Sequence, residues 1–590
     1  MPFWSRETIR RSETPAEIKA TGLSAFEKFF FVNPLREVYS RVKQTGQPGI
    51  LERVLREMRI EVQVAAEDLL RIPETGAALV VANHPFGILD GAALGALMTR
   101  IRPDVKLLTN YLVGAVEELA ELCIYLDPFQ RASARAVNVA GLRRAVAHLR
   151  QGGLLVMFPA GEVSHWQFRH GEVTDPEWSP VAARLVRLSG APVIPVLFTG
   201  RNSVSYQVLG VVHPKLRTIQ LPREFLNKAG KEIALRVGTP VLAEKICRIE
   251  NDQQATNYLR WRTYLLRRRE PAAPLAPPAQ PMLDVLPPSD REAVVSEIEG
   301  LGPESELDEN RDFRVLVAEA SSIPRTLVEI GRQRELAFRQ AGEGTGKELD
   351  LDRFDAHYRH LILWHKKDAQ VAGGYRLANT DQVLSTHGLQ GLYTTTLFWI
   401  DPELFEHTGP ALELGRSFVR REYQKQYAPL LMLWKGIARY LTRHPETPVL
   451  FGPVSISSSY NRTSRELLFE FFKSQRGNPL SEWIRPKRPF RSRPLPDWEL
   501  RALRHLLDLE EMSSSIAEIE GDGKGLPVLL RQYLKLGGEL LGFNVDKNFS
   551  DVLDGLILVD LRKTDHARLA TYMGKEGVAR LLGVHAPTTV

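Results

Sequence analysis

An apolar run followed at once by a polar, glycine-containing turn constrains the fold of this chain more than any other feature. Residues 77–82 (Ala-Ala-Leu-Val-Val-Ala) have the length of a buried strand, and residues 92–98 have the pattern of a beginning helix. Between them, residues 83–91 read Asn-His-Pro-Phe-Gly-Ile-Leu-Asp-Gly. Because α/β proteins place reactive side chains in strand-to-helix turns, the sequence predicts an α/β domain with a site here.

This turn contains a histidine, His84, and an aspartate, Asp90. An imidazole can accept a proton near neutral pH, and a carboxylate can hold its other nitrogen and stabilise the imidazolium. No serine or cysteine stands beside the pair, so the substrate would supply the nucleophile. A structural turn with a hydrogen-bonded surface histidine is the alternative interpretation.

The composition limits the classes of protein that this chain can represent. A length of 590 residues is too great for one core, so we expect two or three domains. Only Cys123 and Cys247 are cysteines, which excludes a disulfide scaffold and a cysteine-rich metal site, and we expect no metal. The net charge of +6 suits an acidic protein, an anionic membrane surface or a nucleic acid. Scattered basic residues without a recognition motif disfavour nucleic acid.

The chain shows neither a secretory signal nor an apolar run of about 18 residues. We therefore expect a cytoplasmic protein that is at most peripheral, on the cytoplasmic face of a membrane. An aromatic cluster at residues 26–32 could enter a lipid interface, although a core-facing helix is the preferred interpretation. The basic block at residues 259–270 could attract anionic headgroups or be a solvated helix end.

Composition and periodicity predict four segments. These are a helical segment that could associate with a membrane (1–70), an α/β domain (71–265), a proline-rich linker (266–292) and a second mixed α/β domain (293–590). Predicted strands cover residues 154–158, 192–198, 361–364, 371–377, 392–400, 411–419 and 449–452, and a helix covers residues 430–440. The strand at 154–158 ends in a polar loop, where open α/β sheets bind ligands.

The first half resembles the glycerolipid acyltransferase superfamily over residues 70–240. The family's first motif places four residues between its histidine and aspartate, whereas His84 and Asp90 enclose five. Its third motif usually reads Phe-Pro-Glu-Gly-Thr, and residues 158–162 read Phe-Pro-Ala-Gly-Glu. The resemblance implies that His84 is the general base on a substrate hydroxyl and that Asp90 orients it. It also assigns Arg131, Gly161 and Glu162 to acceptor binding, although a helix-start carboxylate is an equal explanation of Glu162.

The second half resembles GNAT-fold N-acyltransferases related to acyl-homoserine lactone synthases and ornithine-lipid N-acyltransferases. The matching motifs are Arg334 with Phe338, an Asp-x-Asp-x-x-Asp run at residues 350–355, Arg376, and a Glu-x-x-Arg pair formed by Glu413 and Arg416. Each motif is weak alone, but their shared order over one region is a strong signal.

The chemistry of amine acylation suits these residues. An ammonium group must lose a proton before it attacks an acyl thioester, and we expect Glu413 to accept that proton. Asp352 and Asp355 would contact the substrate or organise the site, and Arg376 and Arg416 would pair with them or hold the amino acid's carboxylate. A buried ion-pair network that only holds the fold is the alternative.

The expected acyl donor is an acyl carrier protein and not coenzyme A. GNAT enzymes that use coenzyme A carry a glycine-rich loop after this region, but residues 419–425 contain no glycine. Arg420, Arg421 and Lys425 would then contact the acidic carrier, although a solvated helix end explains them equally well. No other cofactor is expected.

Together the two halves resemble bifunctional ornithine-lipid synthases. The C-terminal domain would join a 3-hydroxyacyl group to ornithine, and the N-terminal domain would acylate the 3-hydroxyl of that lyso-lipid. The alternatives are a lysophospholipid O-acyltransferase fused to an N-acyltransferase for glycine, lysine or glutamine, or a binding scaffold without activity.

Overall fold

The computed structural model describes residues 33–44, 49–110, 113–114, 116–127, 134–269, 282–474, 478–493, 495–503 and 509–584. The chain forms two compact units. Unit 1 comprises residues 1–269 and 495–507, and unit 2 comprises residues 270–494 and 508–590. Both are mixed α/β, which confirms the predicted fold class. Parts of the first 70 residues and of the linker, and residues 128–133 with Arg131, lie outside the described residues.

Unit 1 is built on a seven-stranded sheet with the order β1-β9-β8-β2-β5-β3-β4. Its neighbouring strands run parallel except for β8 and β9. The strands are β1 (Glu61–Val64), β2 (Ala78–Ala82), β3 (Val105–Asn110), β4 (Cys123–Leu126), β5 (Leu154–Met157), β8 (Val193–Phe198) and β9 (Glu232–Val237), and a separate hairpin comprises β6 (His165–Gln167) and β7 (Glu172–Thr174).

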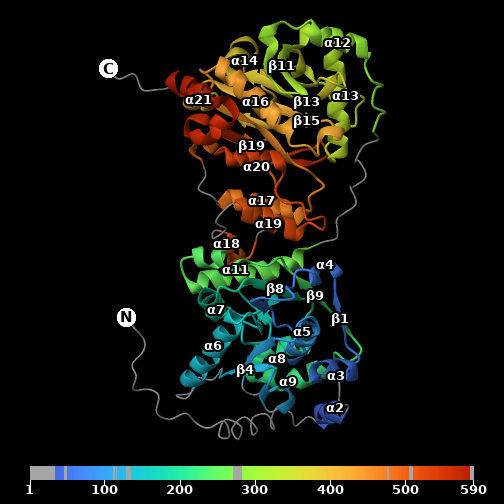
Figure 1. The fold of residues 1–590 in the computed structure, drawn as a ribbon, viewed down its shortest axis with the longest axis vertical. Coiled ribbons are helices and arrows are strands. Elements are labelled where there is room, and N and C mark those ends of the chain that lie inside the picture. Colours follow the sequence, from blue (N-terminus) through green and yellow to red (C-terminus); the bar gives the residue numbers. More distant parts are fainter. Residues whose placement is uncertain are drawn as a thin grey trace, which may run out of the picture. The chain divides into compact units, whose positions relative to one another are not determined.

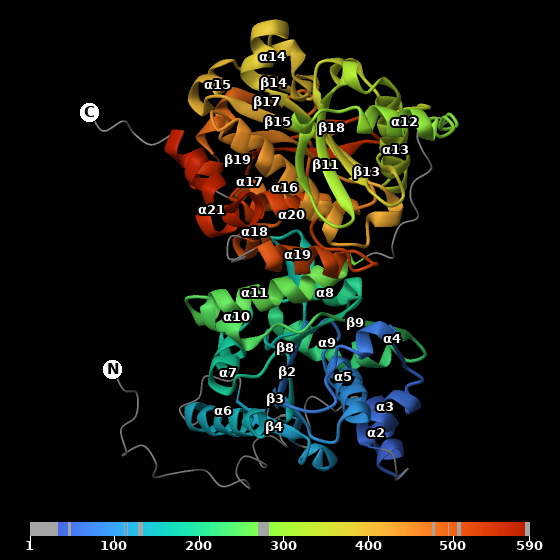
Figure 2. The same ribbon diagram turned by 45° about the horizontal axis from the view of Figure 1, so that its top comes forward.

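Helices cover both faces of this sheet (Figure 2). They are α2 (Asn33–Gln44), α3 (Ile50–Glu57), α4 (Ala66–Leu69), α5 (Ile88–Ile101), α6 (Ala134–Arg150), α7 (Val181–Ser189), α8 (Val204–Val212), α9 (Pro214–Leu226), α10 (Ala243–Arg248), α11 (Asp252–Leu265) and α18 (Asp497–Leu503). Every residue of β2 is buried, because alternate side chains enter the layer beneath α3 and α5 while the others face α11.

The predicted strands at 77–82, 154–158 and 192–198 are confirmed as β2, β5 and β8. The prediction of a wholly helical region up to residue 70 was wrong, because β1 pairs in parallel with β9. A short edge strand carries little sequence signal of its own. The sequence-based division assigns residues 497–503 to the C-terminal domain, whereas in the structure α18 packs on α11 in unit 1.

Unit 2 is built on an eight-stranded sheet with the order β10-β11-β12-β13-β15-β16-β19-β18 (Figure 1). Its strands are β10 (Glu306–Glu309), β11 (Phe313–Glu319), β12 (Arg359–His365), β13 (Gln370–Asn379), β15 (Ala411–Val419), β16 (Val449–Ile456), β18 (Glu539–Asp546) and β19 (Val552–Asp560), and β14 (Phe398–Ile400) pairs with β17 (Ile484–Pro486).

The helices of unit 2 pack on both sides of this sheet. They are α12 (Arg291–Glu299), α13 (Pro324–Gln340), α14 (Thr380–His387), α15 (Glu403–Thr408), α16 (Ala428–Arg443), α17 (Arg462–Ser474), α19 (Leu509–Ile519), α20 (Val528–Lys535) and α21 (His566–Val584). α12 and α13 share a core with Leu316 and Ile362. On the opposite face, Gly436 of α16 approaches Val315 and Leu361 so closely that a Cβ would clash with them.

Among the described strands of this sheet, β15 and β16 form the only parallel pair. They pair over three positions, from Ala411 with Val449 to Glu413 with Phe451. Beyond this point β15 stays paired with β13, and β16 with β19. The two strands therefore separate just after Glu413, and Arg416 follows where β15 is free of β16.

Most predicted elements of this half are confirmed, including the β12–β13 hairpin, β15, β16 and α16. The predicted strand at 392–400 was wrong over its first half, because residues Tyr393–Thr396 form a 3₁₀ turn and only Phe398–Ile400 are extended. The β-branched and aromatic residues here favour a strand. However, the backbone N–H groups of Tyr393 and Thr394 donate hydrogen bonds to the buried carboxylate of Glu413 and not to a neighbouring strand.

Candidate active sites

The turn after β2 brings His84 and Asp90 together. His84 Nδ1 lies 2.9 Å from Asp90 Oδ2, and the histidine side chain is 20% exposed while the aspartate is fully buried. The His84 ring also stacks on Phe158 at the end of β5, with 4.4 Å between ring centroids. The imidazole is thus held from two sides and remains partly accessible, as a general base requires.

Local backbone geometry explains how five intervening residues still close this pair. Gly87 adopts a positive φ of 83°, a conformation open to glycine, and serves as the N-cap of α5. Asp90 Oδ2 accepts hydrogen bonds of 2.9 Å from the backbone N–H groups of both Phe86 and Gly87. Burial raises the pKa of Asp90, while His84 and these two N–H groups oppose that rise.

Sequence reasoning missed a second carboxylate at this site, Asp175. Its Oδ1 accepts a 3.1 Å hydrogen bond from the backbone N–H of His84 and another from the Ser164 hydroxyl. Its Oδ2 accepts a 2.8 Å hydrogen bond from Trp178 Nε1. Asp175 therefore fixes the backbone of His84 to the segment after β7, and the Asp-Pro-Glu-Trp sequence gave no signal of that role.

The predicted acceptor-binding residues lie near this turn, except Arg131, which is outside the described residues. Gly161 has a φ of +67° in the loop after β5. Glu162 is exposed and lies 3.6 Å from the guanidinium of Arg217 on α9. The Ser164 N–H donates a 2.8 Å hydrogen bond to the His84 carbonyl, so this loop and the histidine turn are joined.

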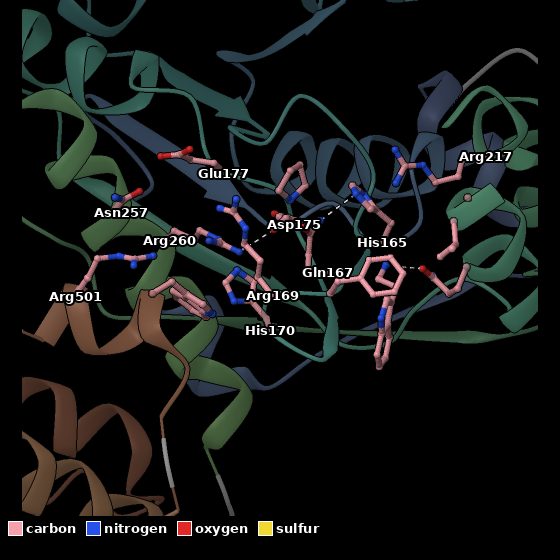
Figure 3. A pocket seen from close by; sticks show the side chains of 17 residues that line it. His165, Gln167, Arg169, His170, Asp175, Glu177, Arg217, Asn257, Arg260 and Arg501 are labelled. Carbon is pink, nitrogen blue, oxygen red and sulfur yellow. Dashed lines mark hydrogen bonds between the residues drawn. The ribbon is translucent and has the colours of Figure 1, made fainter. Parts of the chain in front are cut away.

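A cavity of about 580 Å³ opens beside these loops (Figure 3). Its wall comes from the β6–β7 hairpin and the residues after it, from α8, α9 and α11, and from α18. Asp175 lines the cavity, which places the residue that anchors His84 in the cavity wall.

In unit 2 the predicted motif residues converge on one arginine–carboxylate network, which we define as Arg334, Asp350, Asp352, Asp355, Arg376 and Arg416. Arg334 donates hydrogen bonds of 2.9 Å to Asp350 and 2.7 Å to Asp355, and its side chain is 1% exposed. Burial would raise the pKa of both carboxyl groups, but Arg334 with Arg416 lowers that of Asp350, and Arg334 with Arg376 lowers that of Asp355.

The outer part of this network is more accessible. Arg376 donates a 2.6 Å hydrogen bond to Asp352, whose side chain is 25% exposed. Arg416 lies 3.2 Å from Asp350 and 3.5 Å from Asp352, and donates a 3.1 Å hydrogen bond to the Tyr393 hydroxyl. Its positive φ of 49°, unusual for a non-glycine residue, coincides with the end of the β15–β16 pairing.

Glu413 is buried beside this network and contacts four protein donors. It accepts hydrogen bonds from the Tyr358 hydroxyl, from the Thr394 hydroxyl, and from the backbone N–H groups of Tyr393 at 3.2 Å and Thr394 at 2.6 Å. Burial raises the pKa of Glu413, and these donors counteract the rise. Its carboxylate therefore also holds the 3₁₀ turn Tyr393–Thr396, and a proton could reach it through Tyr358.

The predicted carrier contacts lie after β15. Arg421 and Lys425 are exposed, whereas Arg420 is half-buried and donates a 2.6 Å hydrogen bond to Gln370. Arg421 begins the 3₁₀ turn Arg421–Tyr423, and Lys425 lies between this turn and the start of α16.

A second group of carboxyl groups was not predicted: Asp546 and Asp554 interact with Arg416, and Glu343 interacts with Asp554. Asp546 and Asp554 project from β18 and β19, and Glu343 follows α13. Burial and the negative charges of Asp546 and Glu343 raise the pKa of Asp554, and Arg416 opposes this rise. Burial raises the pKa of Glu343 to about 7. An acidic region therefore adjoins Arg416, which alternating strand sequences alone do not reveal.

Two family models match the chain. One described as "Acyltransferase" matches residues 52–272, and one described as "Acetyltransferase (GNAT) domain" matches residues 333–435. The "Glycine N(alpha)-acyltransferase" of Bacteroides thetaiotaomicron is 32% identical over 277 residues, covering 43% of this chain and 82% of that protein. The chain belongs to the acyltransferase family of this relative.

The "Lyso-glycine lipid O-acyltransferase" of Phocaeicola vulgatus is 28% identical over 190 residues, covering 31% of this chain and 65% of that protein. A crystal structure of the 1-acyl-sn-glycerophosphate acyltransferase PlsC from Thermotoga maritima aligns with 43% of this chain and 99% of that chain. Its TM-score is 0.25 and its identity 18%, which is too weak a likeness to support an argument.

The protein is thus an acyltransferase that joins an acyltransferase domain to a GNAT domain. The first matched region contains His84, Asp90 and Asp175, and the second contains the whole arginine–carboxylate network and Glu413. Among the helices that the structure describes, none has the length and apolar character needed to span a membrane.

Proposed function

We propose that this acyltransferase makes a two-chain aminolipid in two steps. Unit 2 transfers a 3-hydroxyacyl group from an acyl carrier protein to the amine of an amino acid, and unit 1 transfers a second acyl group to the 3-hydroxyl of that lyso-lipid. One observation carries the proposal: each unit holds its own candidate site. Unit 1 contains the close pair of His84 and Asp90, and unit 2 contains the arginine–carboxylate network with Arg416. The step order follows from chemistry, because the hydroxyl that is acylated second arrives with the first chain.

For N-acylation, the amine must lose its proton before its lone pair attacks the thioester carbonyl. We assign the proton to Glu413, received through the Tyr358 hydroxyl that hydrogen-bonds to it. The amine–carbon bond then forms, the carbon–sulfur bond breaks, and the carrier thiol leaves. Arg416 holds the carboxylate of the amino acid, and Arg376 keeps Asp352 in place.

For O-acylation, His84 accepts the proton of the 3-hydroxyl while the oxygen attacks the second thioester. Asp90, at 2.9 Å from His84 Nδ1, stabilises the imidazolium that forms. The imidazolium then supplies the proton to the departing thiolate. This route needs no covalent enzyme intermediate.

We propose ornithine as the amino acid. Glycine has no side chain to occupy the acidic region of Glu343, Asp546 and Asp554, whereas the ammonium group of ornithine would neutralise it. A cation entering this region would lower the raised pKa of Asp554 and ionise the carboxyl group. Glycine is the second candidate, because the relatives that match are named for glycine and lyso-glycine lipid.

The deciding experiment supplies the purified protein with a 3-hydroxyacyl carrier protein and equal amounts of ornithine, lysine, glutamine and glycine. Mass spectrometry should find mainly the ornithine product, and Asp554→Asn should shift the preference toward uncharged amino acids. Predominant glycine acylation by the parent protein would exclude ornithine, and no amino-acid acylation at all would exclude the proposed function.

We also propose that the acyl donor is an acyl carrier protein and that the enzyme works at a membrane surface. Exposed Arg421 and Lys425 suit an acidic carrier protein, and a peripheral position on the cytoplasmic face of the membrane suits a lipid product. Replacing acyl carrier protein with the corresponding acyl-coenzyme A tests the donor, since we expect much slower N-acylation with the latter.

A further inference from the structure

The cavity of unit 1 is strongly cationic. Arg169, Arg217, Arg260 and Arg501 line it, and its two carboxylates are Asp175 and Glu177. Both Asp175 oxygens already accept hydrogen bonds from His84, Ser164 and Trp178. The arginines therefore outnumber the carboxylate groups that remain to neutralise them, which favours an anionic ligand.

Arg260 is a fixed donor in the wall of this cavity. It is 6% exposed, its guanidinium lies over the Trp498 ring at 4.5 Å, and it donates a 2.7 Å hydrogen bond to the Asp175 carbonyl. Its Nε, however, is buried and has no hydrogen-bond acceptor among the described residues. The Trp498 ring and the Asp175 carbonyl thus hold the Arg260 guanidinium in one position in the cavity wall.

Other positively charged side chains surround Arg260 and add to the positive potential of the cavity. Burial and the positive charges of Arg260, Arg501 and Arg169 lower the pKa of His170, and Glu172 opposes them. Glu172 itself pairs with Arg267 at 2.6 Å. Figure 3 shows Arg501, Arg260 and Arg169 on one side of Asp175, and Arg217 on the other. A small anion between them would be bound by several guanidinium groups.

The edge of the cavity is apolar. Val211 of α8 lines it, and Val204, Val208 and Val212 on the same helix are 72%, 56% and 71% exposed. These positions share one helix face. Phe168 in the β6–β7 hairpin is 74% exposed and also lines the cavity. A ligand with a charged head and an acyl chain matches a cationic cavity that opens on an apolar rim.

We propose that this cavity binds the anionic headgroup of the lyso-lipid that unit 1 acylates, with the free carboxylate of the N-acylated amino acid between Arg260, Arg501 and Arg169. This inference rests on the proposed function and names the acceptor subsite of its second step. Asp175 lines the cavity and holds the backbone of His84, so a carboxylate bound here would place a hydroxyl of the same molecule on the side of the catalytic turn.

The site also depends on a distant part of the sequence. Trp498 and Arg501 come from α18, which belongs to unit 1 although it follows most of unit 2 along the chain. The acceptor specificity of the O-acyltransferase is therefore completed by residues outside its own continuous domain.

A phosphate group on the arm of the acyl carrier protein has the same chemistry as the proposed ligand and is the competing occupant. The two differ in which Michaelis constant depends on the cavity. An acceptor carboxylate predicts that removing an arginine raises KM for the lyso-lipid, whereas a donor phosphate predicts a raised KM for the acyl carrier protein.

The test uses the full chain with Arg501→Glu, and with Arg248→Glu as the matched control on an exposed part of α10 outside the cavity. We expect Arg501→Glu to raise KM for the lyso-lipid by about tenfold, with KM for the donor unchanged and Arg248→Glu like the parent. Amidation of the lyso-lipid carboxylate should raise KM for this substrate in the parent protein. The parent and Arg501→Glu should then have the same KM for the amidated lyso-lipid. A raised donor KM, or no change in either constant, would overturn the proposal.

A binding measurement separates this proposal from the proposed function. The His84→Ala protein, which should not turn over, is titrated with an N-(3-hydroxyacyl) amino acid with and without Arg501→Glu. Weaker binding by the double variant supports binding of the headgroup in the cavity, even if the parent protein acylates no lyso-lipid. Equal binding by both proteins would overturn the proposal that the cavity binds this headgroup, but it would not contradict the proposed reaction.

Discussion

Asp175 Oδ1 accepts a 3.1 Å hydrogen bond from the backbone N–H of His84, which lies 91 positions earlier in the chain. The same carboxylate accepts hydrogen bonds from the Ser164 hydroxyl and from Trp178 Nε1. One buried group therefore connects the β2–α5 turn, the loop after β5 and the segment after β7. The position of His84 thus depends on a residue outside the motif that contains it.

We expect Asp175→Asn to lower kcat for O-acylation about tenfold with little change in either KM. The amide keeps the shape of the side chain but can accept through one atom only, so a buried donor loses its partner at a cost of about 1–3 kcal/mol. Steady-state kinetics on the lyso-lipid check this, with N-acylation by the same protein as the control for folding. An unchanged kcat would show that Asp175 does not position His84.

The substitution His84→Ala should lower O-acylation roughly 10²–10⁴-fold, because the hydroxyl loses its general base. N-acylation should continue, so the mono-acylated lipid should accumulate in mass spectra of lipid extracts. Asp90→Asn should have a smaller effect in the same direction. If the doubly acylated lipid still forms at the parent rate in His84→Ala, the assignment of O-acylation to unit 1 is wrong.

The substitution Glu413→Ala should abolish both lipids, since the second step lacks its acceptor without the first. Supplying the lyso-lipid should restore O-acylation, which separates a lost base from a misfolded protein. Tyr358→Phe keeps the ring but removes the hydroxyl that donates to Glu413, and should also slow N-acylation. Full N-acylation by Tyr358→Phe would exclude the proton route through this tyrosine.

Arg334 and Arg416 should differ in what their loss affects. Arg334 is 1% exposed and pairs with Asp350 and Asp355, so Arg334→Met removes the guanidinium that hydrogen-bonds to two buried carboxylates and should cost about 3–5 kcal/mol of unfolding free energy. Arg416→Lys keeps a charge beside Asp350, and we expect it to raise KM for the amino acid with a smaller loss of stability. Denaturant unfolding and kinetics together check this, and equal stability losses would make Arg416 purely structural.

Glu343 should make the protein less stable as pH rises. Burial raises its pKa to about 7 from an ordinary value of 4.5, so the folded state binds more protons than the unfolded state between these pH values. Its contribution is therefore favourable below about pH 4.5 and is lost as pH rises through 7. Glu343→Gln should remove about 1–2 kcal/mol of this dependence in urea unfolding, after allowance for partial exposure.

The exposed residue Glu348 offers the matched control for that experiment. The variant Glu348→Gln should keep the pH dependence of the parent protein. A parent whose stability does not fall between pH 5 and 8, or a Glu343→Gln variant that retains the fall, would contradict the prediction.

The basic block at residues 259–270 shows where sequence interpretation failed. It suggested either attraction to the anionic surface of a membrane or a solvated helix end, yet Arg260 and Arg262 are 6% and 2% exposed. Arg268 pairs with Glu499 at 2.7 Å and Arg269 with Asp68 at 2.6 Å. The partners lie far away in the chain, so a run of like charges looked solvated when read alone.

Local patterns by themselves determined the mixed α/β class, three of the seven strands of the unit 1 sheet, four of the eight strands of the unit 2 sheet, the His84–Asp90 turn and the order of the arginine and carboxylate motifs. Periodicity, turn residues and short spacings carry this information because they depend on neighbours in the chain. Tertiary structure alone decided that Asp175 anchors His84, that α18 completes a cationic cavity in unit 1, and that Asp546 and Asp554 adjoin Arg416. These relationships join segments through a buried hydrogen bond, a helix contact and adjacent strands, and no local pattern specifies which distant residues will meet.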